Sequence, residues 1–125
     1  MVKFRAGKNS TLLKSTISAA KGLIAAIRTE KKVRQVIITA AVVTALCVIA
    51  DVGYFQILMI IFSWVVALIC EIFNTALEKA LDYASGKEFH PLIRDGKDYA
   101  AACTFIALVF AIALALFVLL DRLLK

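Results

Sequence analysis

Residues 71–82 read Glu-Ile-Phe-Asn-Thr-Ala-Leu-Glu-Lys-Ala-Leu-Asp and follow directly on a long apolar run that ends at Cys70. Within that run, from residue 36 to residue 69, only Asp51 is charged. Ionised groups are costly at the edge of a membrane, so residues that carry them there are commonly functional. The stretch therefore predicts a helix that carries a functional site where it leaves the membrane. Its acidic and amide side chains fall on one stripe of a 3.6-residue helix: Glu71, Asn74, Glu78 and Asp82.

The composition is that of an integral membrane protein. Hydrophobic residues make up 62% of the 125 residues, which is more than a soluble domain of this length carries. Apolar runs long enough to cross a bilayer predict transmembrane helices at about 34–51, 54–84 and 91–121. Gly86 is a typical helix stop, and Trp64 is expected to pack within the membrane. The predicted fold class is an all-α membrane protein with three transmembrane helices.

The N-terminal segment predicts a further, amphipathic helix at about 9–29. Apolar residues recur there at spacings of three and four, and Lys14, Lys21 and Arg28 recur every seven residues on an adjacent face. Asn9-Ser10-Thr11 offers an N-cap. Such a helix is expected to lie along the membrane surface beside anionic phospholipid headgroups. A helix packed on the bundle remains an equal alternative, whereas nucleic acid is a poorer partner because binding modules are absent.

The distribution of basic residues predicts the orientation. Residues 1–34 hold nine Lys and Arg against one acidic residue, and they contain no cleavable signal pattern. With three crossings they share a side with residues 83–98, and that side, with Lys79 of the preceding helical extension, collects 13 Lys and Arg against two on the other. The positive-inside rule assigns the richer side to the cytoplasm. We expect a multi-pass protein of the cytoplasmic (inner) membrane with a cytoplasmic N-terminus.

The predicted cytoplasmic face could build a magnesium–nucleotide site. Carboxylate and amide oxygens suit Mg²⁺, and lysines suit phosphate oxygens. No G-x-x-x-x-G-K-[ST] or G-x-G-x-x-G motif occurs, so side chains and metal would replace a glycine-rich loop. Glu71, the deepest carboxylate, could take a proton from a hydroxyl group held at the interface. The polar residues of this face are Glu30, Glu71, Asn74, Glu78, Asp82, Glu88, His90, Arg94, Asp95, Lys97 and Asp98.

Plainer interpretations remain open for several of these side chains. Asp82, Glu88 and Asp95 are equally consistent with a solvated helix face. His90 precedes a proline and is typical of a helix cap or a loop. Glu30 lies in a basic stretch, where a simple salt bridge is the default expectation.

The chain resembles the prokaryotic diacylglycerol kinase family, small integral-membrane lipid kinases that include the undecaprenol kinases. The resemblance covers nearly the whole chain, and its core pattern E-x-x-N-[ST]-A-x-E-x-x-x-D runs from Glu71 to Asp82. Two further blocks carry it: downstream His90-Pro91-Leu92, Lys97-Asp98 and Ala100-Ala101-Ala102, and upstream Lys21-Gly22-Leu23, Ala25-Ala26, Glu30 and Arg34-Gln35.

The resemblance implies a homotrimer of three-span protomers with an amphipathic surface helix, and it implies roles for individual residues. Glu71 would be the general base, and Asn74 would support it or the γ-phosphate. Glu30 and Glu78 would hold Mg²⁺ at the nucleotide phosphates. ATP contacts would come from Glu88, Phe89, His90, Lys97 and Asp98, and the lipid headgroup would lie near Lys21, Arg34 and Gln35.

We therefore expect residues 1–125 to form a single membrane lipid-kinase domain that moves the γ-phosphoryl group of ATP to diacylglycerol, giving phosphatidic acid. Undecaprenol is the alternative acceptor. Ser18 and Ala20 replace an aromatic pair common in the diacylglycerol-specific branch, and His90-Pro91-Leu92 is closer to the undecaprenol branch. An alternative of another class is a non-catalytic oligomeric pore or scaffold, although no polar stripe runs along a span to line a channel.

Overall fold

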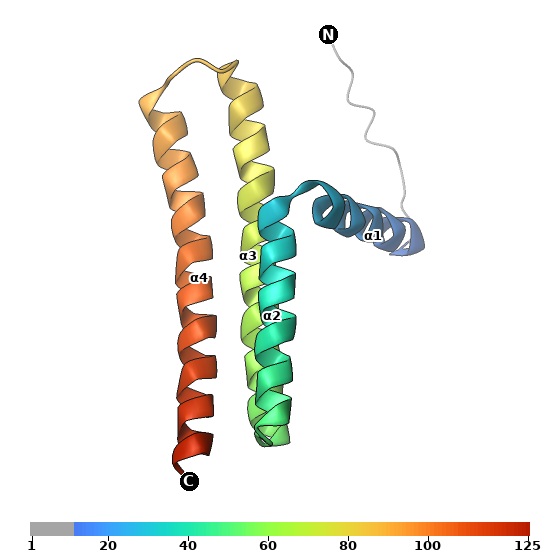
Figure 1. Cartoon of the computed structure of the whole chain (residues 1–125). Coiled ribbons are helices and arrows are strands. Elements are labelled where there is room, and N and C mark those ends of the chain that lie inside the picture. The colour runs from blue at the N-terminus through green and yellow to red at the C-terminus, as the bar shows by residue number, and fades with distance from the viewer. Residues whose placement is uncertain (1–11) are drawn as a thin grey trace.

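Four helices make up residues 12–125, the part of the chain that this computed structural model describes. Three long helices, α2 (Lys31–Ile49), α3 (Tyr54–Ser85) and α4 (Pro91–Leu124), lie side by side, and α1 (Leu12–Thr29) runs roughly at right angles to them at the N-terminal end of α2 (Figure 1). Each of the three is long and apolar enough to cross a membrane. The all-helical fold class is therefore confirmed, together with the expectation of three helices long and apolar enough to span a membrane.

The helix ends follow local signals in the sequence. Gly86 ends α3 in the left-handed region with φ of 59°, which glycine adopts without a steric penalty. Pro91 occupies the first turn of α4, where its missing N–H is not needed. His90 caps that helix, because its Nδ1 accepts a hydrogen bond from the backbone N–H of Leu92 at 3.2 Å. The capping interpretation of His90 is thus confirmed.

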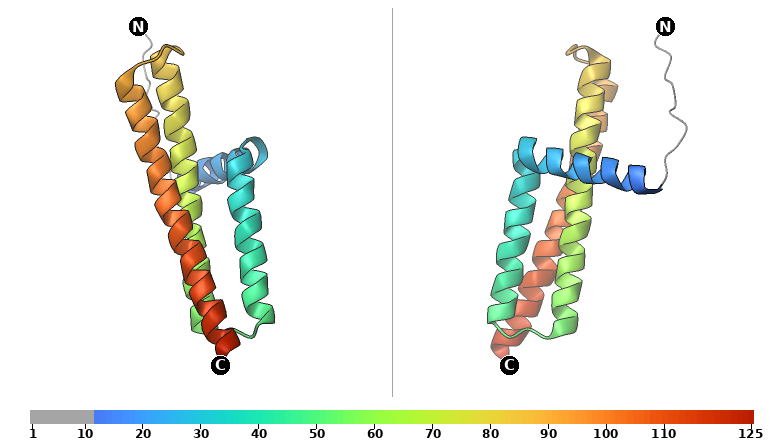
Figure 2. Two further views of the ribbon diagram at one scale, coloured as in Figure 1. Left: turned by 60° about the vertical axis from the view of Figure 1, so that its left-hand side comes forward. Right: turned by 90° about the vertical axis from the view of Figure 1, so that its right-hand side faces the viewer.

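The three spans differ in length, and this difference positions the polar residues. At 1.5 Å per residue, the 19 residues of α2 extend about 28 Å, close to the thickness of a bilayer's hydrocarbon core. The 32 residues of α3 and the 34 of α4 extend about 50 Å. Figure 2 shows the excess length as a hairpin that rises past α1. The tip of the α3–α4 hairpin therefore lies well beyond the span of α2.

Helix α1 is joined to α2 by a sharp elbow at Glu30. Arg34 ties this elbow, since its Nη1 donates to the carbonyl oxygens of Ile27 at 3.1 Å and Arg28 at 2.8 Å. These carbonyls end α1 and have no partner within the helix. The proposed cap at residues 9–11 lies outside the described part of the chain, and placement of α1 on a membrane surface stays a prediction.

A tight antiparallel seam joins α3 to α4 along their whole length. Near the hairpin tip, a Cβ on Gly96 would lie 3.2 Å from Leu81 Cδ1, and Lys97 forms an ion pair with Asp82. Buried small residues continue the seam towards the other end, among them Ala67 and Ala111, both fully buried. Without a hydrophobic driving force between helices in lipid, small residues allow the close contact that holds them together.

Candidate functional site

The N-terminal members of the polar stripe of α3 face the interior of the protein. Glu71 and Asn74 are each only 3% exposed, and Glu78 is half-buried one turn further on. Asp82 is exposed and pairs with Lys97 of α4 instead. The continuous helix through Ser85 therefore keeps the predicted stripe, but only its first three members face inward.

Glu71 lies at the depth where the apolar part of the bundle ends. It is 17 residues along α3 from Tyr54, which corresponds to about 26 Å of helix. A bilayer core of about 30 Å that starts at Tyr54 would therefore end close to Glu71. This depth agrees with the expectation that Glu71 is the deepest carboxylate of the site.

Two ion pairs connect this stretch of α3 to the α1–α2 elbow. Lys79 Nζ lies 3.0 Å from Glu30 Oε1, and Lys32 Nζ lies 3.8 Å from Glu78 Oε1. The hydrogen bond from Lys79 holds the pKa of the Glu30 carboxyl below its ordinary value. The salt bridge expected for Glu30 is therefore present, although its partner comes from α3 and not from the neighbouring basic residues. We call Glu30, Lys32, Glu71, Asn74, Glu78 and Lys79 the interfacial cluster.

Two oxygen atoms of the interfacial cluster are buried without a hydrogen-bond partner. They are Oε1 of Glu71 and Oδ1 of Asn74. The Asn74 amide uses its other end, donating from Nδ2 to Glu78 Oε1 at 3.5 Å. Buried polar atoms are normally paired, so unpaired ones call for an explanation such as a catalytic role or a missing ligand. The cluster thus offers a free carboxylate oxygen and a free amide oxygen to a third group.

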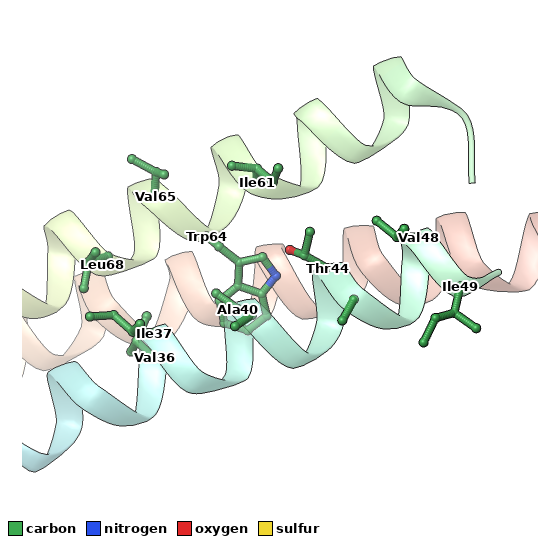
Figure 3. Close-up of a pocket in the computed structure, with 12 residues that line it drawn as sticks. Val36, Ile37, Ala40, Thr44, Val48, Ile49, Ile61, Trp64, Val65 and Leu68 are labelled. Atoms are coloured by element: carbon green, nitrogen blue, oxygen red, sulfur yellow. The ribbon is translucent and has the colours of Figure 1, made fainter. Parts of the chain in front are cut away.

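A groove leads from Glu71 into the apolar part of the bundle. This Glu71 groove has a volume of about 300 Å³ and is lined by Lys32, Gln35, Val36, Thr39, Trp64, Glu71, Leu108 and Ile112. It shares Val36 and Trp64 with a larger groove of about 620 Å³ between α2 and α3, lined almost entirely by apolar side chains. Figure 3 shows the Trp64 ring reaching from α3 towards α2 beside Ala40 and Thr44. The Glu71 groove therefore runs from Glu71 along mostly apolar side chains as far as Trp64.

A second polar region lies at the tip of the α3–α4 hairpin. We call it the hairpin groove; its volume is about 320 Å³. Ser85, which lines it, is 14 residues beyond Glu71 on α3, a distance of about 20 Å along the helix axis. The predicted nucleotide residues at 88–90 and Lys97 therefore gather in one place, apart from the predicted base in the same chain. The hairpin groove is lined by Asp82, Ser85, Lys87, Glu88, Phe89, His90, Ile93, Arg94 and Lys97.

The remaining predicted residues take different positions. Gln35 lines the Glu71 groove, as a residue near a lipid headgroup would. Arg34 uses its guanidinium on the end of α1, so its observed contacts are structural. Lys21 is exposed on α1, and Asp98 is exposed on α4 next to Lys97. The roles assigned to these four residues stay predictions.

Three residues of the site were not predicted as site residues. Lys32 and Lys79 supply the positive charges of the interfacial cluster, and Trp64 lines both grooves in addition to packing as expected. The spacing gave one usable signal, since Trp64, Glu71 and Glu78 recur every seven residues and so share a helix face.

The donor set for a divalent cation is small. Within residues 12–125, no three acidic, histidine or cysteine residues are grouped so that they could hold a metal ion. Glu30 and Glu78 come from different elements, and their charges both act on Glu71. Because Mg²⁺ commonly binds through one or two carboxylates with phosphates and waters completing the shell, two carboxylates fit that ion.

Comparison with known proteins shows the family of this chain. The profile of the family described as prokaryotic diacylglycerol kinase matches residues 17–119. The chain is 31% identical over 99 residues to a diacylglycerol kinase of Helicobacter pylori, covering 79% of this chain and 77% of that protein. It is 33% identical over 97 residues to a diacylglycerol kinase of Pseudomonas aeruginosa, covering 78% of each. The matched region contains the interfacial cluster and the hairpin groove, and the chain belongs to the prokaryotic diacylglycerol kinase family, a family of lipid kinases that points to the bacterial inner membrane.

Proposed function

We propose that this protein is an ATP-dependent kinase that phosphorylates the free hydroxyl group of diacylglycerol at the inner lip of the membrane. One observation carries the proposal: Glu71 is 3% exposed, has an unpartnered Oε1, and ends a groove that leads in from apolar surface. A general base needs a free lone pair within reach of the proton it removes. A lipid whose chains follow the apolar groove would present its hydroxyl group at that oxygen.

The residues around Glu71 suit phosphoryl transfer. Catalysis of this reaction depends mainly on in-line positioning and on stabilising phosphate charge. Glu71 would accept the hydroxyl proton, and the Asn74 amide would orient the carboxylate or the γ-phosphate. Lys32 and Lys79, now paired with carboxylates, would turn to the phosphate oxygens of a bound nucleotide.

Glu30 and Glu78 are the residues that would hold a magnesium ion. In this structure each of the two carboxylates pairs with a lysine, Glu30 with Lys79 and Glu78 with Lys32. A cation would take the place of these lysines. When bound, the ion would neutralise charge on the nucleotide phosphates. The observation that supports a magnesium site is that Glu30 and Glu78, two carboxylates from separate elements, both lie near Glu71.

We further propose that ATP contacts Lys97, Asp98 and the segment 88–90, and that three copies of the chain assemble. Between 72% and 83% of each span's most apolar window stays unburied within one protomer. Neighbouring copies would cover part of this apolar surface. The basic end, with α1 and the hairpin, would face the cytoplasm.

Undecaprenol is the second acceptor to be tested, because the sequence His90-Pro91-Leu92 favours that branch. Both lipids present one hydroxyl group at the interface with an apolar tail, and the apolar groove of about 620 Å³ suits either tail. The chemistry of the groove therefore does not favour one acceptor over the other.

The deciding experiment supplies purified protein in nanodiscs with radiolabelled ATP, magnesium and one acceptor at a time. We expect labelled phosphatidic acid from diacylglycerol and less product from undecaprenol. A Glu71→Gln preparation controls for contaminating kinase. The opposite preference would assign the chain to the undecaprenol branch. Label in neither lipid, together with ion flux from liposomes without ATP, would support the non-catalytic alternative.

A further inference from the structure

Besides Trp64 Nε1, three buried side-chain polar atoms of α3 and α4 near the predicted base have no hydrogen-bond partner. Two are Glu71 Oε1 and Asn74 Oδ1, and the third is the hydroxyl oxygen of Thr104 on α4. Thr104 is 5% exposed and belongs to no motif noted in the sequence. An unpaired hydroxyl buried in a membrane bundle is costly, so its presence requires a reason.

The register of the seam places Thr104 opposite Asn74. Lys97 pairs with Asp82, and Gly96 lies against Leu81, which fixes the register of the two antiparallel helices. Starting from these pairs, the same number of residues counted back along α3 and forward along α4 leads to the same height in the bundle. Eight residues back from Asp82 is Asn74, and seven forward from Lys97 is Thr104. The two side chains therefore lie within about one residue, 1.5 Å, of the same height along the helices.

The same register holds further into the membrane. Buried residues of α3 and buried residues of α4 keep matching at this offset. The matching pairs are Ala67 with Ala111, Ser63 with Ala115, and Ile60 with Val118. Asn74 and Thr104 thus continue one row of matched, buried positions on α3 and α4.

The Thr104 hydroxyl is free to donate. Threonines inside helices usually return their hydroxyl hydrogen to a carbonyl of the preceding turn, as Thr16, Thr29 and Thr39 do here at 2.8–2.9 Å. Thr104 makes no such bond. Opposite it, Asn74 Oδ1 is an acceptor without a donor. A donor without an acceptor therefore faces an acceptor without a donor in the same buried row.

Both atoms are unpaired in this structure, and we infer that Thr104 is a positioning residue: when the two side chains turn towards each other across the seam, its hydroxyl donates a hydrogen bond to Asn74 Oδ1 and fixes the orientation of the Asn74 amide. A fixed carbonyl end leaves the NH₂ end directed at Glu78, where its 3.5 Å contact is already observed. Without the hydroxyl group, the amide is free to turn over and present its oxygen to a carboxylate. The kinetic consequence rests on the proposed function, whereas the contact itself does not.

A spectroscopic test examines the contact without any enzyme activity. The chain has two asparagines, Asn9 and Asn74, so selective ¹⁵N-asparagine labelling gives two side-chain NH₂ signals, assigned with Asn74→Ala. We expect Thr104→Val to shift the Asn74 signal and speed its exchange with solvent. Thr104→Ser should restore the wild-type signal. An unchanged Asn74 signal in Thr104→Val would overturn the inference.

Kinetics then show whether the contact matters for turnover. Thr104→Val keeps the side-chain shape, and losing one buried hydrogen bond should lower kcat roughly tenfold with KM for ATP within about twofold. Ser63→Ala is the matched control, because its hydroxyl in the same seam already bonds to its own helix at 2.7 Å. In an Asn74→Ala background, Thr104→Val should have no further effect. An additive loss, or a Ser variant that fails to recover, would refute positioning through Asn74.

Discussion

Replacing Glu71 by glutamine should abolish turnover and, at the same time, make the protein more stable. The substitution keeps the shape of the side chain and removes its charge. Glu71 is 3% exposed and one of its oxygens has no partner. A buried charge without full compensation destabilises the fold, and active sites commonly retain such groups because the chemistry needs them.

The size of both effects follows from the surroundings of the carboxylate. Removing a general base typically lowers turnover by about 10²–10⁴-fold. For stability, burial removes the Glu71 carboxylate from water, while the two lysines of the interfacial cluster pair with Glu30 and Glu78 and not with Glu71. The amide therefore avoids the cost of burying a charge that has no ion-pair partner. We expect a net gain of about 1–3 kcal/mol in the free energy of unfolding, or a Tm higher by roughly 5–10 °C.

The assay follows thermal unfolding in nanodiscs through the fluorescence of Trp64, the sole tryptophan of the chain. Asp121→Asn is the control, since this carboxylate lies at the far end of α4 and pairs only with Lys125. The control should retain wild-type turnover and a Tm equal to or slightly below wild type. An inactive Glu71→Gln with a lower Tm would show that the carboxylate is stabilised in the resting protein. An active Glu71→Gln would refute its assignment as the base.

Further substitutions test the packing and the charges around the site. Gly96→Val should cost about 1–3 kcal/mol, because a Cβ there already lies 3.2 Å from Leu81 Cδ1, and Leu81→Ala should recover part of the lost Tm. Arg122→Gln should lower stability by about 1 kcal/mol without lowering turnover, since it ties only the exposed turn at the far end at 2.7–3.1 Å; loss of turnover would contradict this. The pKa of Glu30 is lowered because its carboxylate pairs with Lys79. This pair therefore stabilises the fold fully at a pH above 4.5, the ordinary pKa of the carboxyl group, and the stabilisation is lost as the pH falls through the lowered pKa. Lys79→Gln should therefore have a lower Tm than wild type at neutral pH and an equal one in acid, and a difference independent of pH would exclude this pair as its cause.

The helices and their ends could be predicted because their signals are local. Apolar runs of sufficient length define α2, α3 and α4, and the predicted starts at 54 and 91 coincide with Tyr54 and Pro91. The first span begins at Lys31, three residues before the predicted boundary at 34, because the elbow is only one residue long. The stripe from Glu71 to Glu78 was predictable for the same reason, since helical periodicity alone sets it.

The pairing of charges could not be predicted in this way. Glu30 meets Lys79, and Lys32 meets Glu78, across more than 40 residues of sequence. These contacts depend on the angle at which α1 and α2 meet α3. That angle is set by tertiary contacts such as the bonds from Arg34 to the end of α1, which no periodicity reveals. Composition alone would have left Glu30 paired with an adjacent lysine.

The α3–α4 seam connects packing deep in the membrane to the geometry of the polar site. Ala67 and Ala111 are fully buried, so α3 and α4 are in close contact about 10 Å below Asn74. Helices that touch through such small residues have no side chains long enough to absorb a change in spacing or register. The height at which Thr104 faces Asn74 is therefore fixed from below by small apolar residues and from above by Gly96. In this protein the orientation of a buried amide beside the proposed base depends on how closely two helices approach, and residues without any polar atom in their side chains set that approach.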